Sequence, residues 1–487
     1  MDQFAVVTWP TTAEGNYAPG FKLSEMKKIL IPATGLMLVF VAFLIMRSGT
    51  SDPAVRSIQD YDKTLHVTAR DWAQFMRNPD RTGWVLLPTP HEGPEFTSDI
   101  NPHAAGFIRP EVCGECHQDI YESFLQTAHF RTASWPDAQN ILGSFAAGKN
   151  RVNTRVPGFY FEMNVRDDGF YHDLHVDTGE VEYRLSEKIG LVVGSGNHGQ
   201  SYLYWSGDQL LQMHVSYFTE MDGWVNSPGF YVDGTADMAR PVTGRCVECH
   251  NTWFAQAPDS ANRFDKATAI PGVTCVRCHG PGREHVEHHQ QNPDSTAGQH
   301  IVNPGNLRRE RMNEVCAQCH SGGEQLRESF TYVPGEPLED YLAIDLSGEN
   351  ASNEDPHSAN QLARLIKSRC FQKSDSMTCA TCHNPHQQER GNQALFSDRC
   401  RECHQTQDCI EFPDLGVAIQ NRCIECHMPA RRDDVVSVHT SDGKTVTPLL
   451  RDHYIRGWPD AAARVRQSIL RTIRSGSSSV QSSLQER

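Results

Sequence analysis

The chain lacks the features that define several large classes of proteins. Its 45 lysines and arginines are outnumbered by 60 aspartates and glutamates, and the formal net charge of −15 argues against nucleic-acid binding. Mean hydropathy is −0.52, and a single apolar run, at residues 29–46, is long enough to cross a bilayer. A protein with many membrane spans is therefore excluded. Glycine and proline follow no fixed period, which excludes a collagen-like chain.

What the chain has in excess is cysteine in one fixed arrangement. Fourteen of the sixteen cysteines lie in seven copies of Cys-x-x-Cys-His, and no Cys-x-x-Cys occurs without the histidine. The copies, motifs one to seven below, are Cys113-Cys116-His117, Cys246-Cys249-His250, Cys275-Cys278-His279, Cys316-Cys319-His320, Cys379-Cys382-His383, Cys400-Cys403-His404 and Cys423-Cys426-His427.

This pattern predicts covalent attachment of c-type haem. Two thiols separated by two residues can form thioethers to the vinyl groups on one edge of a porphyrin. The next residue then lies under the iron, where a neutral imidazole binds as the proximal ligand. Paired Cys-x-x-Cys units could instead hold structural zinc. Zinc gives no reason for a histidine in every copy, and an odd number of units would leave one unpaired. We therefore expect seven covalently attached haem c groups.

Sixteen further histidines are enough to give every iron a second axial ligand. Bis-histidine ligation closes the iron to substrates and suits electron transfer, whereas an open position permits chemistry. The candidates for distal ligands lie near a motif in the sequence: His129, His285, His288, His289, His357, His386 and His453. Two cysteines are left over, Cys370 and Cys409. They could form a disulfide or stay reduced, and their nearness to motifs favours free thiols.

The apolar run at 29–46, ILIPATGLMLVFVAFLIM, just spans a hydrocarbon core at about 1.5 Å per helical residue. Three lysines at 22, 27 and 28 precede it and only Arg47 follows closely, so the positive-inside rule places the haem region outside the cytoplasm. We expect an uncleaved anchor in the bacterial cytoplasmic membrane with the haem region in the periplasm. A cleaved export signal is the alternative, and Met26 is a second candidate start.

The spacing of the motifs predicts the organisation of the chain. A short cytoplasmic N-terminus (1–28) and the anchor (29–46) lead into a polar spacer (47–110). A first haem region (111–330) carries motifs one to four, and a second (331–457) carries motifs five to seven. A basic helix at 461–474 and a disordered Ser-rich end form the tail (458–487). Motifs two to four fall within 246–320 and motifs five to seven within 379–427, which is too little chain for a peptide core. We predict a mainly α and irregular fold with haems as its core.

The long gap between motifs one and two predicts β structure. FYFEMNV and FYHDLHV flank a turn at Asp168-Gly169, and SYLYW and LLQMHVSYF flank Ser206-Gly207-Asp208, as in β-hairpins. We expect a small β insertion from about residue 150 to 235. The letters GSGNHG at 194–199 match a dinucleotide fingerprint, but strand-like SYLYW follows where a helix is required. No nucleotide cofactor is therefore expected.

Several of these segments resemble the cytochrome c-554 type of multihaem cytochrome, within the hydroxylamine oxidoreductase and nitrite reductase superfamily. CGECHQDIYESFLQTAH is similar to that family's first motif and GVTCVRCHGPGREHVEHH to its third, while CVECH and VCAQCH fit the second and fourth. The resemblance implies that His129 and either His288 or His289 are distal ligands. Motifs five to seven resemble a second multihaem pattern, which implies His357, His386 and His453 as ligands.

These observations favour an exported, membrane-anchored cytochrome that carries electrons between other redox proteins or quinol-linked membrane donors, with no nucleic-acid partner. The alternative is a periplasmic redox enzyme that acts on a small nitrogen compound at one five-coordinate haem. The superfamily and the long insertion motivate that alternative. Against it, no motif ends in the lysine of the pentahaem nitrite reductases, and seven motifs are one fewer than in the octahaem hydroxylamine oxidoreductases. Electron transfer is the leading hypothesis.

Overall fold

The computed structural model describes residues 56–57, 66–68, 85–89, 91–100, 105–177, 179, 182–230, 234–344, 356–433 and 436–485. The predicted cytoplasmic segment 1–28 and the predicted anchor 29–46 lie outside these residues. Within them, no helix has both the length and the apolar character needed to cross a bilayer.

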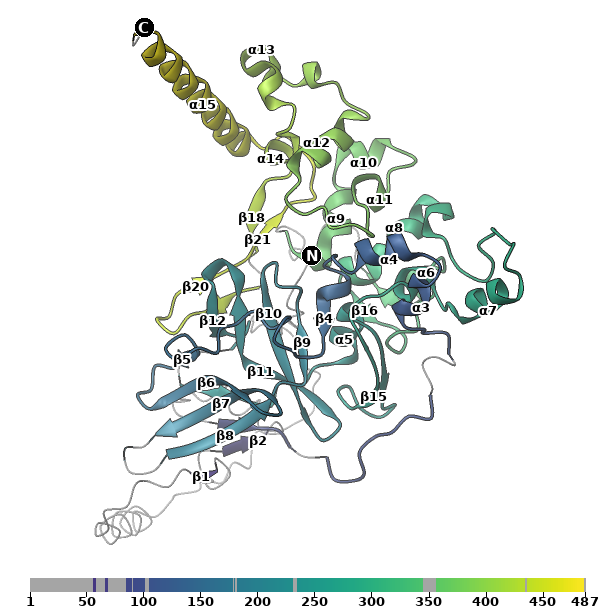
Figure 1. Cartoon of the computed structure of the whole chain (residues 1–487), viewed down its shortest axis with the longest axis vertical. Coiled ribbons are helices and arrows are strands. Elements are labelled where there is room, and N and C mark those ends of the chain that lie inside the picture. Colours follow the sequence, from purple (N-terminus) through teal and green to yellow (C-terminus); the bar gives the residue numbers. More distant parts are fainter. Residues whose placement is uncertain are drawn as a thin grey trace, which may run out of the picture.

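Two β-sheets form the lower part of the molecule in the view of Figure 1. Their strands are β1 (Arg56–Ser57), β4 (Ala133–Ser134), β5 (Arg151–Asn153), β6 (Phe159–Arg166), β7 (Gly169–Asp177), β8 (Glu182–Lys188), β9 (Leu191–Val193), β10 (Gly199–Ser206), β11 (Gln209–Phe218), β12 (Gly223–Asn226), β19 (Val438–His439) and β20 (Thr445–Val446). The strand orders are β1-β8-β7-β6-β5 and β20-β19-β12-β11-β10-β9-β4. Alternate residues of β6, namely Phe159, Phe161 and Met163, are buried against Tyr204 and Val215 of the second sheet. The sheets therefore enclose an apolar core between them.

Both predicted hairpins are confirmed. Strands β6 and β7 pair antiparallel with Arg166 opposite Gly169, and β10 and β11 pair with Ser206 opposite Gln209. GSGNHG is a turn between β9 and β10, as expected. The description of the region as a small insertion is corrected, because β4, β19 and β20 lie outside 150–235 and complete the seven-stranded sheet. Edge strands need hydrogen-bond partners, and segments far away in the sequence supply them here.

A third sheet draws on the segment that precedes motif one. Strand β3 (Val85–Leu87) pairs in parallel with β2 (His66–Thr68) and β13 (Ala236–Asp237). Val85 and Leu86 of β3 are almost completely buried. Part of the segment 47–110, predicted to be a polar spacer, thus belongs to the core of the β half.

Short helices make up the other half of the molecule, shown mostly in green in Figure 1. They are α3 (Pro110–Gly114), α4 (Gln118–Phe124), α5 (Gly244–His250), α6 (Val276–His279), α7 (Arg283–Gln291), α8 (Arg309–His320), α9 (Gln361–Ile366), α10 (Arg369–Lys373), α11 (Cys379–Cys382), α12 (Gln393–Arg401), α13 (Phe412–Leu415) and α14 (Cys423–His427). Three two-stranded sheets accompany them: β14 (Asn251–Gln256) with β15 (Phe264–Pro271), β16 (Glu324–Gln325) with β17 (Leu342–Ala343), and β18 (Ala430–Arg432) with β21 (Leu449–Arg451). The predicted mainly α and irregular fold describes this half only.

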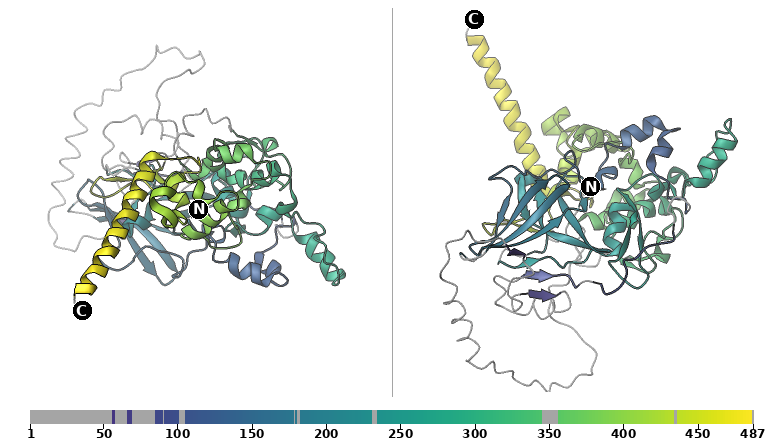
Figure 2. Two further views of the ribbon diagram at one scale, coloured as in Figure 1. Left: turned by 90° about the horizontal axis from the view of Figure 1, so that it is seen from above. Right: turned by 60° about the horizontal axis from the view of Figure 1, so that its bottom comes forward.

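Helix α15 (Pro459–Gln485) projects away from the body in Figures 1 and 2. Its first turns pack on the helical half, where Val465 and Ile469 join Leu415 and Ile419 in one apolar cluster. The helix predicted at 461–474 is confirmed. The prediction of a disordered Ser-rich end is wrong, since the helix continues through that segment to Gln485.

A buried ion pair joins α9 to the end of β21. Arg364 contacts Asp452 through Nε–Oδ1 at 2.9 Å and Nη2–Oδ2 at 2.6 Å, and the two side chains are 2% and 0% exposed. Arg431 adds a contact of 3.0 Å to Oδ2. Because Asp452 precedes His453, the pair also fixes the backbone beside a predicted ligand.

We expect Asp452→Asn to lower the free energy of unfolding by about 3–5 kcal/mol, because it leaves the Arg364 guanidinium buried without its counter-charge. Denaturant unfolding followed by circular dichroism measures this effect. Asp442→Asn is the matched control, since the Asp442–Lys444 pair has side chains that are 56% and 75% exposed, and solvent screens such pairs. Similar midpoints for the Asp452 variant and the native chain would contradict the prediction.

His172 lies inside the β half, where its ring meets Tyr202 and Trp224 edge to face at centroid distances of 5.3 and 5.5 Å. Among the described residues, neither ring nitrogen has a hydrogen-bond partner. Burial lowers the pKa of His172 from 6.5 to about 3, so the imidazole is neutral in the folded chain at neutral pH.

The stability of the β half is therefore expected to fall as the pH drops from 6.5 towards about 3. In that window the unfolded chain binds a proton at His172 and the folded chain does not, so acid favours unfolding. His172→Phe keeps an aromatic ring and removes this proton. The variant should lose less of its thermal midpoint than the native chain between neutral and mildly acidic pH. Equal losses would show that His172 does not contribute.

Candidate haem-binding site

One continuous cavity of about 2470 Å³ runs through the helical half. Pockets for a single ligand typically have volumes of roughly 300–1,000 Å³, so this cavity has the volume of several. All seven motifs line it, with every motif histidine and every motif cysteine except Cys246. Residues spread over more than 300 positions of the sequence thus converge on one space.

Each motif presents its reactive groups through about one helical turn. In four motifs the backbone N–H of the histidine donates to the carbonyl of the first cysteine, at 2.9–3.0 Å: His117 to Cys113, His279 to Cys275, His383 to Cys379 and His404 to Cys400. Residues four apart lie on the same face of a helix. The first thiol and the imidazole therefore point to the same side, as attachment of one planar group requires.

Main-chain carbonyls fix the orientation of several imidazoles. The Nδ1 atoms of His279 and His427 lie 2.9 and 3.0 Å from the carbonyl oxygens of Val302 and Arg456. A carbonyl only accepts, so Nδ1 carries the proton and Nε2 keeps the lone pair that binds a metal. The same arrangement holds outside the motifs, in His285 with Gln299 at 2.8 Å and His453 with Arg451 at 3.1 Å.

The imidazole of motif two is held from the β half. His250 Nδ1 lies 2.8 Å from Thr132 Oγ1, and the backbone N–H of Gly194 donates to the Thr132 carbonyl at 2.7 Å. Gly194 belongs to the GSGNHG turn after β9. This turn thereby helps to position a motif histidine, and its His198 also lines the cavity.

Four motif histidines face a second imidazole at nearly one distance. Ring centroids are 6.0–6.4 Å apart in His117–His285, His279–His386, His320–His129 and His383–His453. A metal–imidazole bond of about 2 Å on each side of one ion places two ring centroids about 6 Å apart. These four pairs therefore have the separation expected of two axial ligands to one iron.

Burial keeps one of these pairs in the form that binds metal. It lowers the pKa values of His383 and His453 from 6.5 to about 4. Both imidazoles are thus neutral at neutral pH, and a neutral imidazole has the free lone pair that a metal needs.

The structure brings some predicted distal ligands opposite a motif and leaves others aside. His129, His386 and His453 each face a motif histidine. On α7, His285 occupies the position that the resemblance implied for His288 or His289. The ring of His289 packs 4.6 Å from that of His285, and His288 lies beside His300 at 5.5 Å. Spacing in the sequence could not separate three histidines within five residues of one helix.

His357 lines the cavity but has the opposite orientation. Its Nδ1 accepts from the backbone N–H of Ala359 at 3.1 Å, so in the neutral ring the proton lies on Nε2. That atom is 3.9 Å from Asp433 Oδ2. The lone pair on Nδ1 of His357 thus accepts a backbone hydrogen bond. Nε2 carries the proton, so it has no lone pair to offer to a metal.

The attachment thiols of several motifs lie close to one another. Each thiol shifts the pKa of its partner in Cys113–Cys275, Cys249–Cys319, Cys316–Cys379 and Cys400–Cys423, which brings motif one beside three, two beside four, four beside five and six beside seven. Weaker interactions raise the pKa of Cys316 through Cys278 and that of Cys400 through Cys382. The motifs thus follow one another as one, three, four, five, six, seven, with motif two beside motif four.

Cys370 and Cys409 are both free thiols that line the cavity. Cys370 interacts with Cys382 and Cys403, whereas Cys409 interacts with Cys426. Each therefore lies beside a different attachment site, as the free-thiol interpretation expects.

A family profile described as "Cytochrome c554 and c-prime" matches residues 225–280, which include motifs two and three. With the repeated motifs and the cavity they share, this match makes the chain a multihaem c-type cytochrome that binds haem c.

Two known proteins are similar to the chain over longer stretches. The dissimilatory sulfite reductase MccA of Wolinella succinogenes is 23% identical over 390 residues, covering 66% of this chain and 50% of MccA. The chain thus spans about half the length of that curated relative. The crystal structure of the outer cell wall cytochrome OcwA aligns with 72% of this chain and 79% of its own, at 17% identity and a TM-score of 0.45.

We expect His285→Ala to convert one haem from low to high spin, because the imidazole opposite His117 is lost. His288→Ala is the matched control on the same helix and should leave the spin state unchanged. Electron paramagnetic resonance of the oxidised proteins measures both. If only the His288 variant changed its spin state, His288 would be the distal ligand, as the family resemblance allowed.

Proposed function

We propose that the chain is an exported seven-haem electron carrier, with one haem attached at each motif. The observation that carries the proposal is that all seven motifs line one shared cavity, with the thiols of neighbouring motifs close together. Each attached haem supplies a one-electron Fe(III)/Fe(II) couple. Haems attached around one cavity are neighbours, and electron transfer over short separations needs no diffusing intermediate.

The residues have distinct tasks in this proposal. The motif cysteines anchor the porphyrin edge and the motif histidines supply the proximal imidazole. His285, His386, His129 and His453 supply the distal imidazole for motifs one, three, four and five. When both axial sites of an iron hold imidazole, substrates cannot bind there, which favours electron transfer over catalysis.

The membrane assignment is part of the same proposal. Residues 29–46 anchor the chain in the bacterial cytoplasmic membrane, and the haem region lies in the periplasm. Electrons pass between quinol-linked donors of the membrane and other redox proteins. The charge asymmetry around the apolar run supports this orientation.

Protein from a host that attaches haem c should carry seven haems per chain in a pyridine haemochrome assay. Cys400→Ser/Cys403→Ser should carry six, because motif six loses both thiols. Cys370→Ser/Cys409→Ser is the matched control, which also loses two cysteines and should keep seven. A loss of haem from the control, or none from the motif-six variant, would contradict the assignment.

A second candidate function is reduction of a small oxyanion at one haem with an open distal side. It is favoured by the similarity of two thirds of this chain to a protein named as a sulfite reductase. Sulfite is therefore the substrate to test, ahead of a nitrogen compound. In the haem-counted preparation, a high-spin signal that responds to CO and oxidation of the reduced protein by sulfite would favour the enzyme. Wholly low-spin spectra without a response to sulfite would favour the carrier.

A further inference from the structure

The residues between the cysteines of motifs two, three and four meet in one buried polar cluster. Glu248 lies within motif two on α5, Arg277 within motif three on α6 and Gln318 within motif four on α8. Glu248 is 6% exposed, and Arg277 and Gln318 are each 4% exposed. The residues between the attachment cysteines thus connect three haem-attachment sites.

Glu248 is the centre of this cluster. Its Oε1 accepts from the backbone N–H of Phe330 at 2.8 Å, and its Oε2 accepts from Gln325 Nε2 at 3.3 Å. Arg245 Nη1 lies 3.2 Å from Oε2, and Arg277 Nη2 lies 3.7 Å from Oε1. The carboxylate is therefore buried and shared between two guanidinium groups.

Arg277 and Gln318 tie motif four to the same group. Gln318 Nε2 donates to the Arg277 carbonyl at 3.1 Å, and Arg277 Nη2 donates to the Glu248 carbonyl at 3.4 Å. Among the described residues, Arg277 Nε has no hydrogen-bond partner. The side chain of Arg277 is only 3% exposed, so its charge is poorly screened by water.

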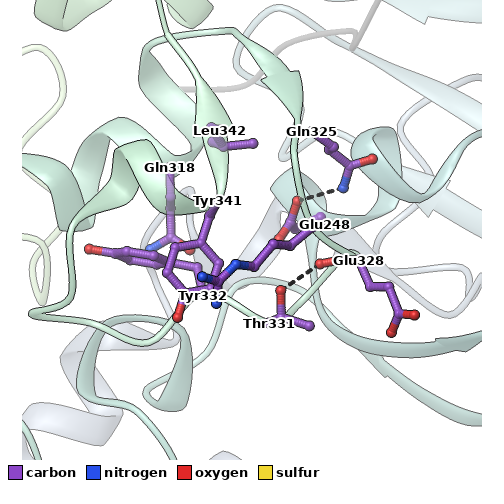
Figure 3. Close-up of a pocket in the computed structure, with 9 residues that line it drawn as sticks. Glu248, Gln318, Gln325, Glu328, Thr331, Tyr332, Tyr341 and Leu342 are labelled. Carbon is purple, nitrogen blue, oxygen red and sulfur yellow. Dashed lines mark hydrogen bonds between the residues drawn. The ribbon is translucent and has the colours of Figure 1, made fainter.

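A small pocket lies beside Glu248. Figure 3 shows Gln318, Gln325 and Tyr332 around Glu248, with a hydrogen bond joining Glu248 to Gln325. The pocket has a volume of about 10 Å³, which is close to the space that one water molecule needs. Charges in such surroundings interact strongly with their neighbours because the local dielectric is low.

The cluster lies directly beside the attachment sites of motifs two and four. Glu248 immediately precedes Cys249 in the sequence, and Gln318 immediately precedes Cys319. Arg245 Nη2 also donates to the carbonyl of Gly322, two residues after His320, at 3.2 Å. The charges of the cluster are therefore close to both sites.

Other motifs show that the sequence position alone does not create this environment. Glutamate occupies the same place, directly before the second cysteine, in motifs one, two, six and seven. Glu115 and Glu402 are exposed and Glu425 is half-buried, whereas Glu248 is 6% exposed. Burial distinguishes Glu248 from its three counterparts.

We propose that Glu248, Arg245 and Arg277 form a buried charge cluster that sets the reduction potentials of the haems attached at motifs two and four. The proposal rests on haem attachment at those motifs, as argued under the proposed function. Reduction removes one positive charge from a haem, so a nearby carboxylate favours the ferric state and a nearby guanidinium the ferrous state. In this scheme Glu248 acts on the haems through its charge.

The two signs of charge provide the test. In spectroelectrochemical titrations of the seven-haem protein, Glu248→Gln should raise the potentials of one or two haems. Arg277→Gln should lower them. Each shift should change the ferrous-to-ferric ratio at fixed potential at least tenfold, which is 59 mV for one electron. A purely structural disturbance would not reverse its direction with the sign of the charge removed.

Glu115→Gln is the matched control, since it makes the same change at the same motif position where the side chain is exposed, and it should leave the potentials of the haems at motifs two and four unchanged. Each variant is first counted for haem and checked for unaltered spin state. Unmoved potentials, shifts of one sign in Glu248→Gln and Arg277→Gln, or an equal shift from Glu115→Gln would overturn the proposal. If Glu248→Gln loses haem, Arg245→Gln replaces it. Both arginine variants should then lower the potentials, and a rise in either would overturn the proposal. A native protein without haem at motifs two to four would instead overturn the proposed function.

Discussion

Helices of twelve residues or fewer are marginal in water on their own, and this constraint governs the whole helical half of the molecule. Each haem-attachment motif is about one helical turn that carries two thiols and an imidazole. Such turns persist only when they pack on a shared core. The cavity of about 2470 Å³ is lined by all seven of them, and its volume, the thiol contacts and the paired imidazoles all fit planar groups bound in its interior. In the proposed function, stability and electron transfer thus depend on the same attachment sites.

The β half supplies what short helices cannot. Its two sheets enclose an apolar core of their own, and their loops reach the helical half. The turn after β9 holds Thr132 by a backbone hydrogen bond, and Thr132 in turn holds the Nδ1 atom of His250. A rigid sheet therefore fixes the orientation of an imidazole in motif two. Strands β19 and β20, which follow motif seven, complete the larger sheet, so the two halves are joined at both ends of the haem region.

How much could be predicted from the sequence follows from how local each interaction is. The hairpins were predictable, because alternation of apolar residues and turn residues act within about twenty positions. The part played by β3 and β19 was not, since two or three residues carry no pattern of their own. The same distinction applies to ligands. His386 lies three residues after a motif, but His285 differs from His288 and His289 only in which of them the fold turns towards His117.

The sequence by itself determined the chemistry: Cys-x-x-Cys-His, repeated seven times, has one explanation that accounts for all three residues. Tertiary structure decided which histidines face each other, the order in which the motifs meet, and which one of four equivalent glutamates is buried. The physical reason is that bond formation depends on residue type and local spacing, both written in the sequence. Pairing, order and electrostatic strength depend on distance and dielectric, and these arise only when segments far apart in the sequence pack against one another.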